Sequence, residues 1–148
     1  MQMKPIIDHI QITVKDLKVA EDFYDNFLPI LGFDIKNKVK AFIEGHDFHV
    51  IEYTHDLLAF AITSPREAFK NDSINRRKPG ALHHLAFKAK TREEVDDAFQ
   101  KLLKIEATIV SAPQIRTEYS ENYYAVYFKD NENIKYEIVC NVFHDHDY

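Results

Sequence analysis

The sequence predicts an α+β fold made of two tandem βαβββ modules. Two segments carry apolar residues at helical spacing, and an alternating, strand-like segment precedes each of them. The second strand–helix pair lies 75 residues after the first in the chain. We place the modules at about residues 5–63 and 80–141, joined by a linker that contains Pro65, Pro79 and Gly80. Since about 70 residues supply only a small core, we expect both modules to form a single domain over residues 1–148.

The first module begins with an alternating strand in which Ile10, Ile12 and Val14 form the apolar face. Asp16 is a plausible N-cap for the helix that follows, and that helix ends near Pro29–Gly32. Its apolar stripe consists of Ala20, Phe23, Tyr24, Phe27 and Leu28. Three further strands are predicted at 33–38, 48–53 and 57–63.

The second module repeats this order. Leu85, Phe87 and Ala89 form the apolar face of its opening strand. Thr91 and Glu94 have the spacing of a capping box at the start of the helix. The helix stripe consists of Val95, Ala98, Phe99, Leu102 and Leu103, and the predicted strands are 108–116, 123–129 and 134–140.

Composition excludes several classes of protein. Nineteen basic and 24 acidic residues give a net charge of −5, which argues against sequence-independent binding to nucleic acid. The longest apolar run, Leu57–Ile62, is far shorter than the ~20 residues that span a bilayer. Cys140 is the only cysteine, which excludes an intrachain disulfide and suits a reducing compartment. With no secretory signal visible at Met1–Asp8, we expect a soluble cytoplasmic protein without nucleic-acid or membrane partners.

Two histidines and one glutamate stand out as candidate metal ligands. His9 and His84 occupy equivalent positions in the two opening strands, on the face opposite the helix. Glu137 lies in an otherwise apolar last strand, where a buried acid is costly unless it is paired or bound to metal. Two imidazoles and a carboxylate can hold a divalent ion with open coordination positions. Alternatively, the histidines cap strand ends and Glu137 pairs with Lys135 or Lys88.

The segment 8–17, followed by Phe23-Tyr24 and 31–33, resembles the opening of vicinal oxygen chelate proteins. This superfamily includes glyoxalase I, extradiol dioxygenases, methylmalonyl-CoA epimerase, fosfomycin resistance enzymes and bleomycin resistance proteins. Residues 80–87 resemble its second opening strand, and 123–130 with 133–137 resemble its closing hairpin. The resemblance covers nearly the whole chain. It implies that the two modules form a cupped mixed sheet around a divalent metal. The usual oligomeric state of the family's members implies a homodimer.

Carried over by position, the resemblance implies that the metal ligands are His9, His84 and Glu137, with Fe, Mn, Zn or Ni as the ion. Alternation turns His83 to the other face. The run 57–62, which supplies a fourth ligand in some members, has no acid, histidine or glutamine, so only Glu52 on the neighbouring strand could substitute. We take Glu137 and a tyrosine as the catalytic groups; Tyr119, Tyr123, Tyr124 and Tyr127 are candidates, and we assign Tyr124.

The predicted function is that of a metal-dependent enzyme whose ion binds vicinal oxygens of a small organic substrate. Lyase, isomerase, dioxygenase and transferase reactions remain open. The alternative is a metal-free protein that binds an antibiotic-type small molecule, as bleomycin resistance proteins do, and a third possibility is a sensor or interaction module. The absent fourth ligand implies an apolar wall for an amphipathic substrate, made of either Leu58, Phe60 and Ile62 or Leu57, Ala59 and Ala61.

Overall fold

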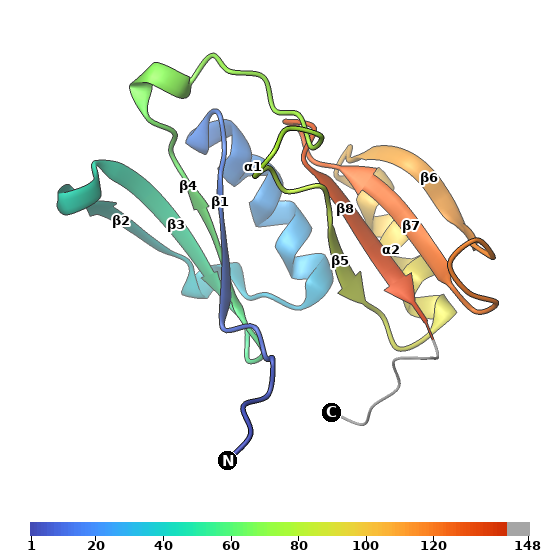
Figure 1. The fold of residues 1–148 in the computed structure, drawn as a ribbon. Helices are drawn as coiled ribbons and strands as arrows, with labels where there is room; N and C mark the ends of the chain where they lie inside the picture. Colours follow the sequence, from blue (N-terminus) through green and yellow to red (C-terminus); the bar gives the residue numbers. More distant parts are fainter. Residues whose placement is uncertain (142–148) are drawn as a thin grey trace. The chain divides into compact units, whose positions relative to one another are not determined.

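The computed structural model describes residues 1–141 and confirms the α+β fold with two βαβββ modules (Figure 1). The chain divides into two compact units, Met1–Asp72 and the part that begins at Ser73, and each is described by itself. Each unit contains one four-stranded mixed sheet and one α-helix. The union of the two modules in a single domain stays a prediction.

In the first module the opening strand runs parallel to the last one, and the remaining strand pairs are antiparallel. The strand order in the sheet is β1-β4-β3-β2. The elements are β1 (His9–Thr13), α1 (Leu17–Phe27), β2 (Val39–Ile43), β3 (Phe48–Thr54) and β4 (Ala59–Thr63).

The ends of α1 agree with the prediction. The Asp16 side chain accepts hydrogen bonds from the backbone N–H groups of Lys18 and Val19, at 3.0 and 3.1 Å. A 3₁₀ turn over Leu28–Leu31 follows the helix and ends at Gly32, whose φ of 91° favours glycine. The buried stripe of α1 faces the sheet, since the ring of Tyr24 stacks on that of Phe60 in β4 at 5.5 Å.

The strand predicted at 33–38 is wrong. Residues Ile35–Asn37 form a 3₁₀ turn, capped by Asp34, whose side chain accepts a hydrogen bond from the N–H of Lys36. The strand follows at Val39–Ile43, where four of its five residues are exposed. An edge strand with so little burial has no alternating apolar signal, so sequence periodicity could not locate it.

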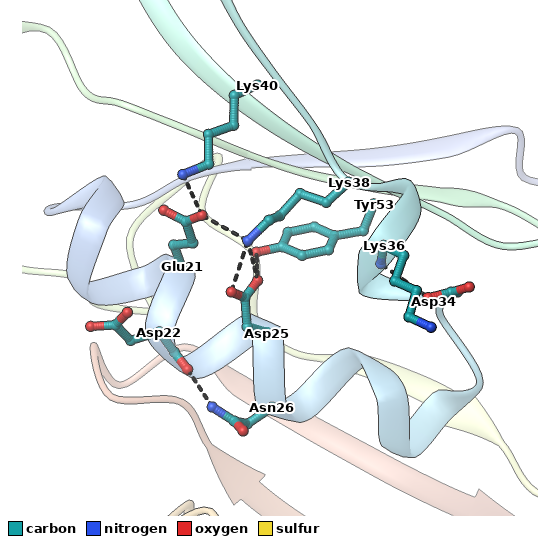
Figure 2. A network of polar contacts seen from close by, with 9 residues as sticks. All are labelled: Glu21, Asp22, Asp25, Asn26, Asp34, Lys36, Lys38, Lys40 and Tyr53. Atoms are coloured by element: carbon teal, nitrogen blue, oxygen red, sulfur yellow. Dashed lines mark hydrogen bonds and ion pairs between the residues drawn. The ribbon is translucent and has the colours of Figure 1, made fainter.

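A polar network joins α1 to the strands of the first module (Figure 2). The ammonium of Lys38 lies 2.8 Å from a carboxylate oxygen of Glu21 and 2.8 Å from one of Asp25, both on α1. The hydroxyl of Tyr53 in β3 donates a hydrogen bond to Asp25 at 2.9 Å, and the Lys40 ammonium lies 2.6 Å from Glu21. These contacts fix the helix against the β2–β3 side of its sheet.

The second module has the same topology, with strand order β5-β8-β7-β6 and a parallel pairing between its opening and last strands. Helix α2 lies against β6, β7 and β8 (Figure 1). The elements are β5 (Leu85–Lys88), α2 (Arg92–Lys104), β6 (Thr108–Ile115), β7 (Tyr124–Lys129) and β8 (Lys135–Cys140).

The predicted N-cap of α2 at Thr91 is confirmed, but the return hydrogen bond to Glu94 comes from the residue before Thr91. Thr91 Oγ1 accepts the Glu94 N–H at 3.2 Å, as in a capping box. The Glu94 carboxylate accepts the N–H of Lys90, at 2.7 Å, rather than that of Thr91. Within residues 1–141, no helix is long and apolar enough to cross a membrane.

Candidate functional site

Glu137 is the central residue of the candidate site. Its side chain is only 1% exposed. Sheet register places it beside Ala86 of β5 and Tyr127 of β7, on the face turned away from α2. The hydroxyl of Tyr123 donates a hydrogen bond to Glu137 Oε1. A buried carboxylate requires such partners, because an unpaired charge in the interior is costly.

His84 faces the second oxygen of this carboxylate. Its Nε2 lies 3.4 Å from Glu137 Oε2, beyond the ~2.7–2.9 Å of a charge-assisted hydrogen bond. Metal–ligand bonds of about 2.1 Å place two ligands of one ion about 3.0–3.4 Å apart, depending on the coordination geometry. The pair therefore has the donor types and the separation of two ligands of one divalent ion.

His83 contributes to the position of His84. The Nδ1 atoms of the two rings are 2.8 Å apart, so the Nδ1 of His84 is engaged and its Nε2 points at Glu137. The predictions for His83 and His84 assumed that both lie in the opening strand, but β5 begins only at Leu85, so strand alternation extends to neither residue. Desolvation and the charge of the neighbouring His84 lower the pKa of His83.

His9 belongs to the first module, at the start of β1. Its Nδ1 lies 2.7 Å from Oδ2 of the adjacent Asp8, which leaves Nε2 as the available nitrogen. A carboxylate on the second nitrogen is the usual way in which proteins orient a metal-binding imidazole. Within residues 1–141 no three His, Cys, Asp or Glu side chains lie together as a metal cluster. The convergence of His9 with His84 and Glu137 therefore stays a prediction.

Two tyrosines surround Glu137. Burial and the hydrogen bond to Glu137 raise the pKa of Tyr123 to about 12. Burial, followed by the charge of Glu137, also raises the pKa of Tyr127. The neighbouring Tyr123 adds to the rise in the pKa of Tyr127. Both hydroxyls therefore remain protonated donors at neutral pH.

The structure does not bring Tyr124 to this site. Its hydroxyl donates to Asp96 Oδ1 of α2 at 2.6 Å, and the Arg92 guanidinium lies 5.4 Å from its ring centroid. Tyr124 therefore faces the helix. Tyr127, three residues further along β7, lies opposite Glu137. The alternation of the closing hairpin was the available signal that separates Tyr124 from Tyr123 and Tyr127.

The equivalent position in the first module is small and apolar. Gln11 pairs with Ala61 as Ala86 pairs with Glu137, so Ala61 occupies the place of the glutamate. Phe60 lies on the helix side, so the wall that shares the face of His9 consists of Ala59 and Ala61. Glu52 of β3 is opposite Ala61 and is exposed on the same face.

A family model described as the glyoxalase/bleomycin resistance protein/dioxygenase superfamily matches residues 6–138. The chain belongs to this superfamily. A Bacillus subtilis relative, uncharacterized protein YqjT, is 28% identical over 132 residues, which cover 89% of this chain and 96% of the relative. A candidate glyoxalase from Bacillus halodurans has a TM-score of 0.72 at 26% identity, with 93% of this chain and 97% of that chain covered. A glyoxylase/bleomycin resistance protein/dioxygenase domain from Frankia has a TM-score of 0.74 at 19% identity, covering 95% and 99%.

Membership in the superfamily, which includes enzymes, leaves the particular reaction open. Sequence reasoning also missed a set of basic side chains around Tyr127. The Lys135 ammonium lies 4.9 Å and the Arg116 guanidinium carbon 5.5 Å from the ring centroid of Tyr127. These residues come from β8 and from the residue after β6, which no short motif connects.

Proposed function

We propose that the protein is a metal-dependent enzyme that acts on a small organic molecule through vicinal oxygens. His9, His84 and Glu137 would hold the ion. The observation that carries the proposal is the pair formed by His84 Nε2 and Glu137 Oε2, which are 3.4 Å apart, on a carboxylate that is 1% exposed. Superfamily membership supports the same assignment at a coarser level.

The residues of this chain fit a divalent ion in their donor chemistry. A neutral imidazole and a carboxylate suit iron, manganese, zinc and nickel alike, so the donor set does not select one of them. When bound, the ion supplies Lewis-acid polarisation of substrate oxygens. Asp8 on His9 and His83 on His84 each engage Nδ1, so that both histidines offer Nε2.

Tyr123 is the proposed acid–base neighbour in place of Tyr124. Its hydroxyl donates to Glu137 Oε1 and leaves Oε2 for the ion. With its pKa raised to about 12, Tyr123 holds its proton at neutral pH and serves as a donor. Tyr127, which lies opposite Glu137 in the sheet, also holds its proton because its pKa is raised.

The rest of the proposal concerns the substrate, the assembly and the location. Ala59 and Ala61 give the first module a small apolar surface on the face of His9, suited to the apolar part of an amphipathic substrate. We propose a small-molecule partner, a homodimer and a cytoplasmic location. The mass in solution, measured by light scattering, tests the dimer.

Metal analysis tests the central assignment. Untagged protein, purified without chelators and then loaded with excess Mn²⁺, Fe²⁺, Ni²⁺ or Zn²⁺ and desalted, should retain about one ion per chain. His84→Ala should lose it. His46→Ala is the matched control, because His46 is exposed on a turn of the first module and should leave binding unchanged. Circular dichroism checks that each variant is folded.

Two outcomes separate the candidate functions. Equal metal retention by wild type and His84→Ala would refute the ligand assignment. If the folded wild type fails to retain any of the four ions, the proposal of a metal-dependent enzyme is wrong. The protein is then better described as a metal-free protein that binds a small molecule.

A further inference from the structure

The cationic cluster, which we define as Arg76, Arg116 and Lys135, lies beside the candidate metal ligands of the second module. Arg116 and Lys135 both lie on Tyr127, and the Tyr127 ring centroid is 6.4 Å from that of His84. Arg76 belongs to the same compact unit of the chain. The cluster therefore adjoins the place where a substrate would meet His84 and Glu137.

Arg76 and Arg116, the two arginines of the cluster, each have an unsatisfied hydrogen-bond donor. The Nε atoms of Arg76 and Arg116 are buried and have no hydrogen-bond partner within the described residues. Arg116 Nη2 donates to Ser111 Oγ, and Nη1 lies 3.6 Å from a carboxylate oxygen of Glu118, which is itself 55% exposed. Because buried donors are normally paired, an unpaired guanidinium Nε indicates a missing acceptor. The Arg116 side chain is 26% exposed, so a ligand can reach it.

We propose that the cationic cluster binds an anionic oxygen group of the substrate, a carboxylate or a phosphoryl group. The inference rests on the proposed function for the place of the reacting end of the substrate, at His84 and Glu137. Guanidinium groups match the planar oxygens of carboxylates and phosphates with paired hydrogen bonds, and an ammonium adds a point charge. The substrate is then a small organic acid or ester of phosphoric acid that also carries vicinal oxygens.

Anion binding to the metal-free protein tests the cluster separately from the metal. Protein stripped with EDTA is titrated with inorganic phosphate and, in a second arm, with acetate, by calorimetry at low ionic strength, where surface charge is least screened. A single site with a dissociation constant in the millimolar range is expected. Tighter phosphate than acetate binding identifies a phosphoryl group, and the reverse order identifies a carboxylate.

Two variants test which residues hold the anion. Arg116→Gln and Lys135→Gln should each weaken binding about tenfold or more, the effect of one hydrogen bond to a charged group. Lys101→Gln is the matched control, since Lys101 lies on α2 and is paired with Asp97 at 2.7 Å. Arg116→Lys keeps the charge and should lie between wild type and Arg116→Gln. Thermal melts check that the variants are folded.

Each outcome bears on the proposal. The proposal is overturned if wild type binds neither anion at tens of millimolar. It is also overturned if Arg116→Gln and Lys135→Gln bind the anion as tightly as wild type, because the site would then hold an adventitious ion only. A loss in Lys101→Gln as large as that in Arg116→Gln also overturns it. The anion is titrated into metal-free protein, whereas metal retention is measured separately with wild type and His84→Ala, so the metal proposal can fail while the anion site stands.

Discussion

The two modules share a topology but place their main clusters of charged side chains on opposite faces of their sheets. In the first module Lys38 joins Glu21 and Asp25 on the helix side (Figure 2). The face of His9 is lined by Ala59 and Ala61. The charges of this module therefore hold a helix in place.

In the second module the main cluster of charged side chains lies on the face of the sheet away from the helix. Glu137, Tyr127 and Lys135 lie on the face away from α2, and Tyr124 with Asp96 is a polar contact on the helix side. The comparison teaches that a repeated apolar pattern determines strand pairing, whereas the residue at one register position decides whether a face carries a buried carboxylate. Ala61 and Glu137 are that position in the two modules.

The largest effect is expected at this position. Glu137→Gln keeps the shape of the side chain and an acceptor for Tyr123, but it removes the charge that a divalent ion requires. Metal affinity should fall more than about 100-fold, beyond the loss typical of an outer-shell partner. Competition with a fluorescent chelator measures it.

Glu52→Gln is the comparison from the first module. Glu52 is exposed opposite Ala61, on the face of His9, so the variant shows whether this glutamate replaces the absent fourth ligand. An unchanged affinity supports a three-ligand site, and a loss of tenfold or more would make Glu52 a ligand. If Glu137→Gln binds metal as tightly as wild type, the chemical distinction between the modules is wrong.

Much of the fold could be predicted because its signals are local. The apolar stripes of both helices and the caps at Asp16 and Thr91 depend on residues within two turns of one another. The strand predicted at 33–38 failed because β2 is an exposed edge strand whose sequence carries no burial pattern. Edge strands are defined by their neighbours in space.

The site could be predicted only in part. Repeat symmetry and the resemblance identified His84 and Glu137, which the structure brings within 3.4 Å. Tyr124 was preferred to Tyr123, although strand alternation separates them. Arg116 was missed because its relation to Tyr127 arises from the pairing of β6 with β7, which contains register shifts and is invisible in a linear pattern.

A smaller effect is expected from the charges of the first module. Lys38→Met removes the cation between Glu21 and Asp25, two carboxylates that are 14% and 27% exposed. The free energy of unfolding should fall by about 1–3 kcal/mol, because two partly buried carboxylates lose a charged donor. Urea denaturation measures it, with Lys36→Met, an exposed neighbour, as the control. An equal loss in both variants would contradict the role of the network.

The same variant has a signature in pH. Burial opposes ionisation of Glu21, but hydrogen bonds from Lys38 and Lys40 outweigh it and lower its pKa below the ordinary 4.5. A carboxyl group whose pKa is lower in the folded than in the unfolded protein stabilises the fold at pH values above its unfolded pKa. This stabilisation is lost as the pH falls through the folded pKa. The stability gap between wild type and Lys38→Met should therefore narrow between about pH 5 and pH 3. A gap that stays constant over this range would contradict the electrostatic origin.

The smallest effect is expected from Tyr124→Phe, which tests the two faces of β7 against each other. The variant removes one exposed hydrogen bond to Asp96, so the free energy of unfolding should fall by about 0.5–1 kcal/mol, and metal affinity should not change. Tyr123→Phe instead deprives the buried Glu137 of its donor, and metal affinity should shift by about tenfold or more. Because the variants differ by one position and remove the same atom, unequal effects on metal affinity report which face of the strand holds the site. A larger change in Tyr124→Phe than in Tyr123→Phe would return the site to the helix side and reverse the assignment of the two tyrosines.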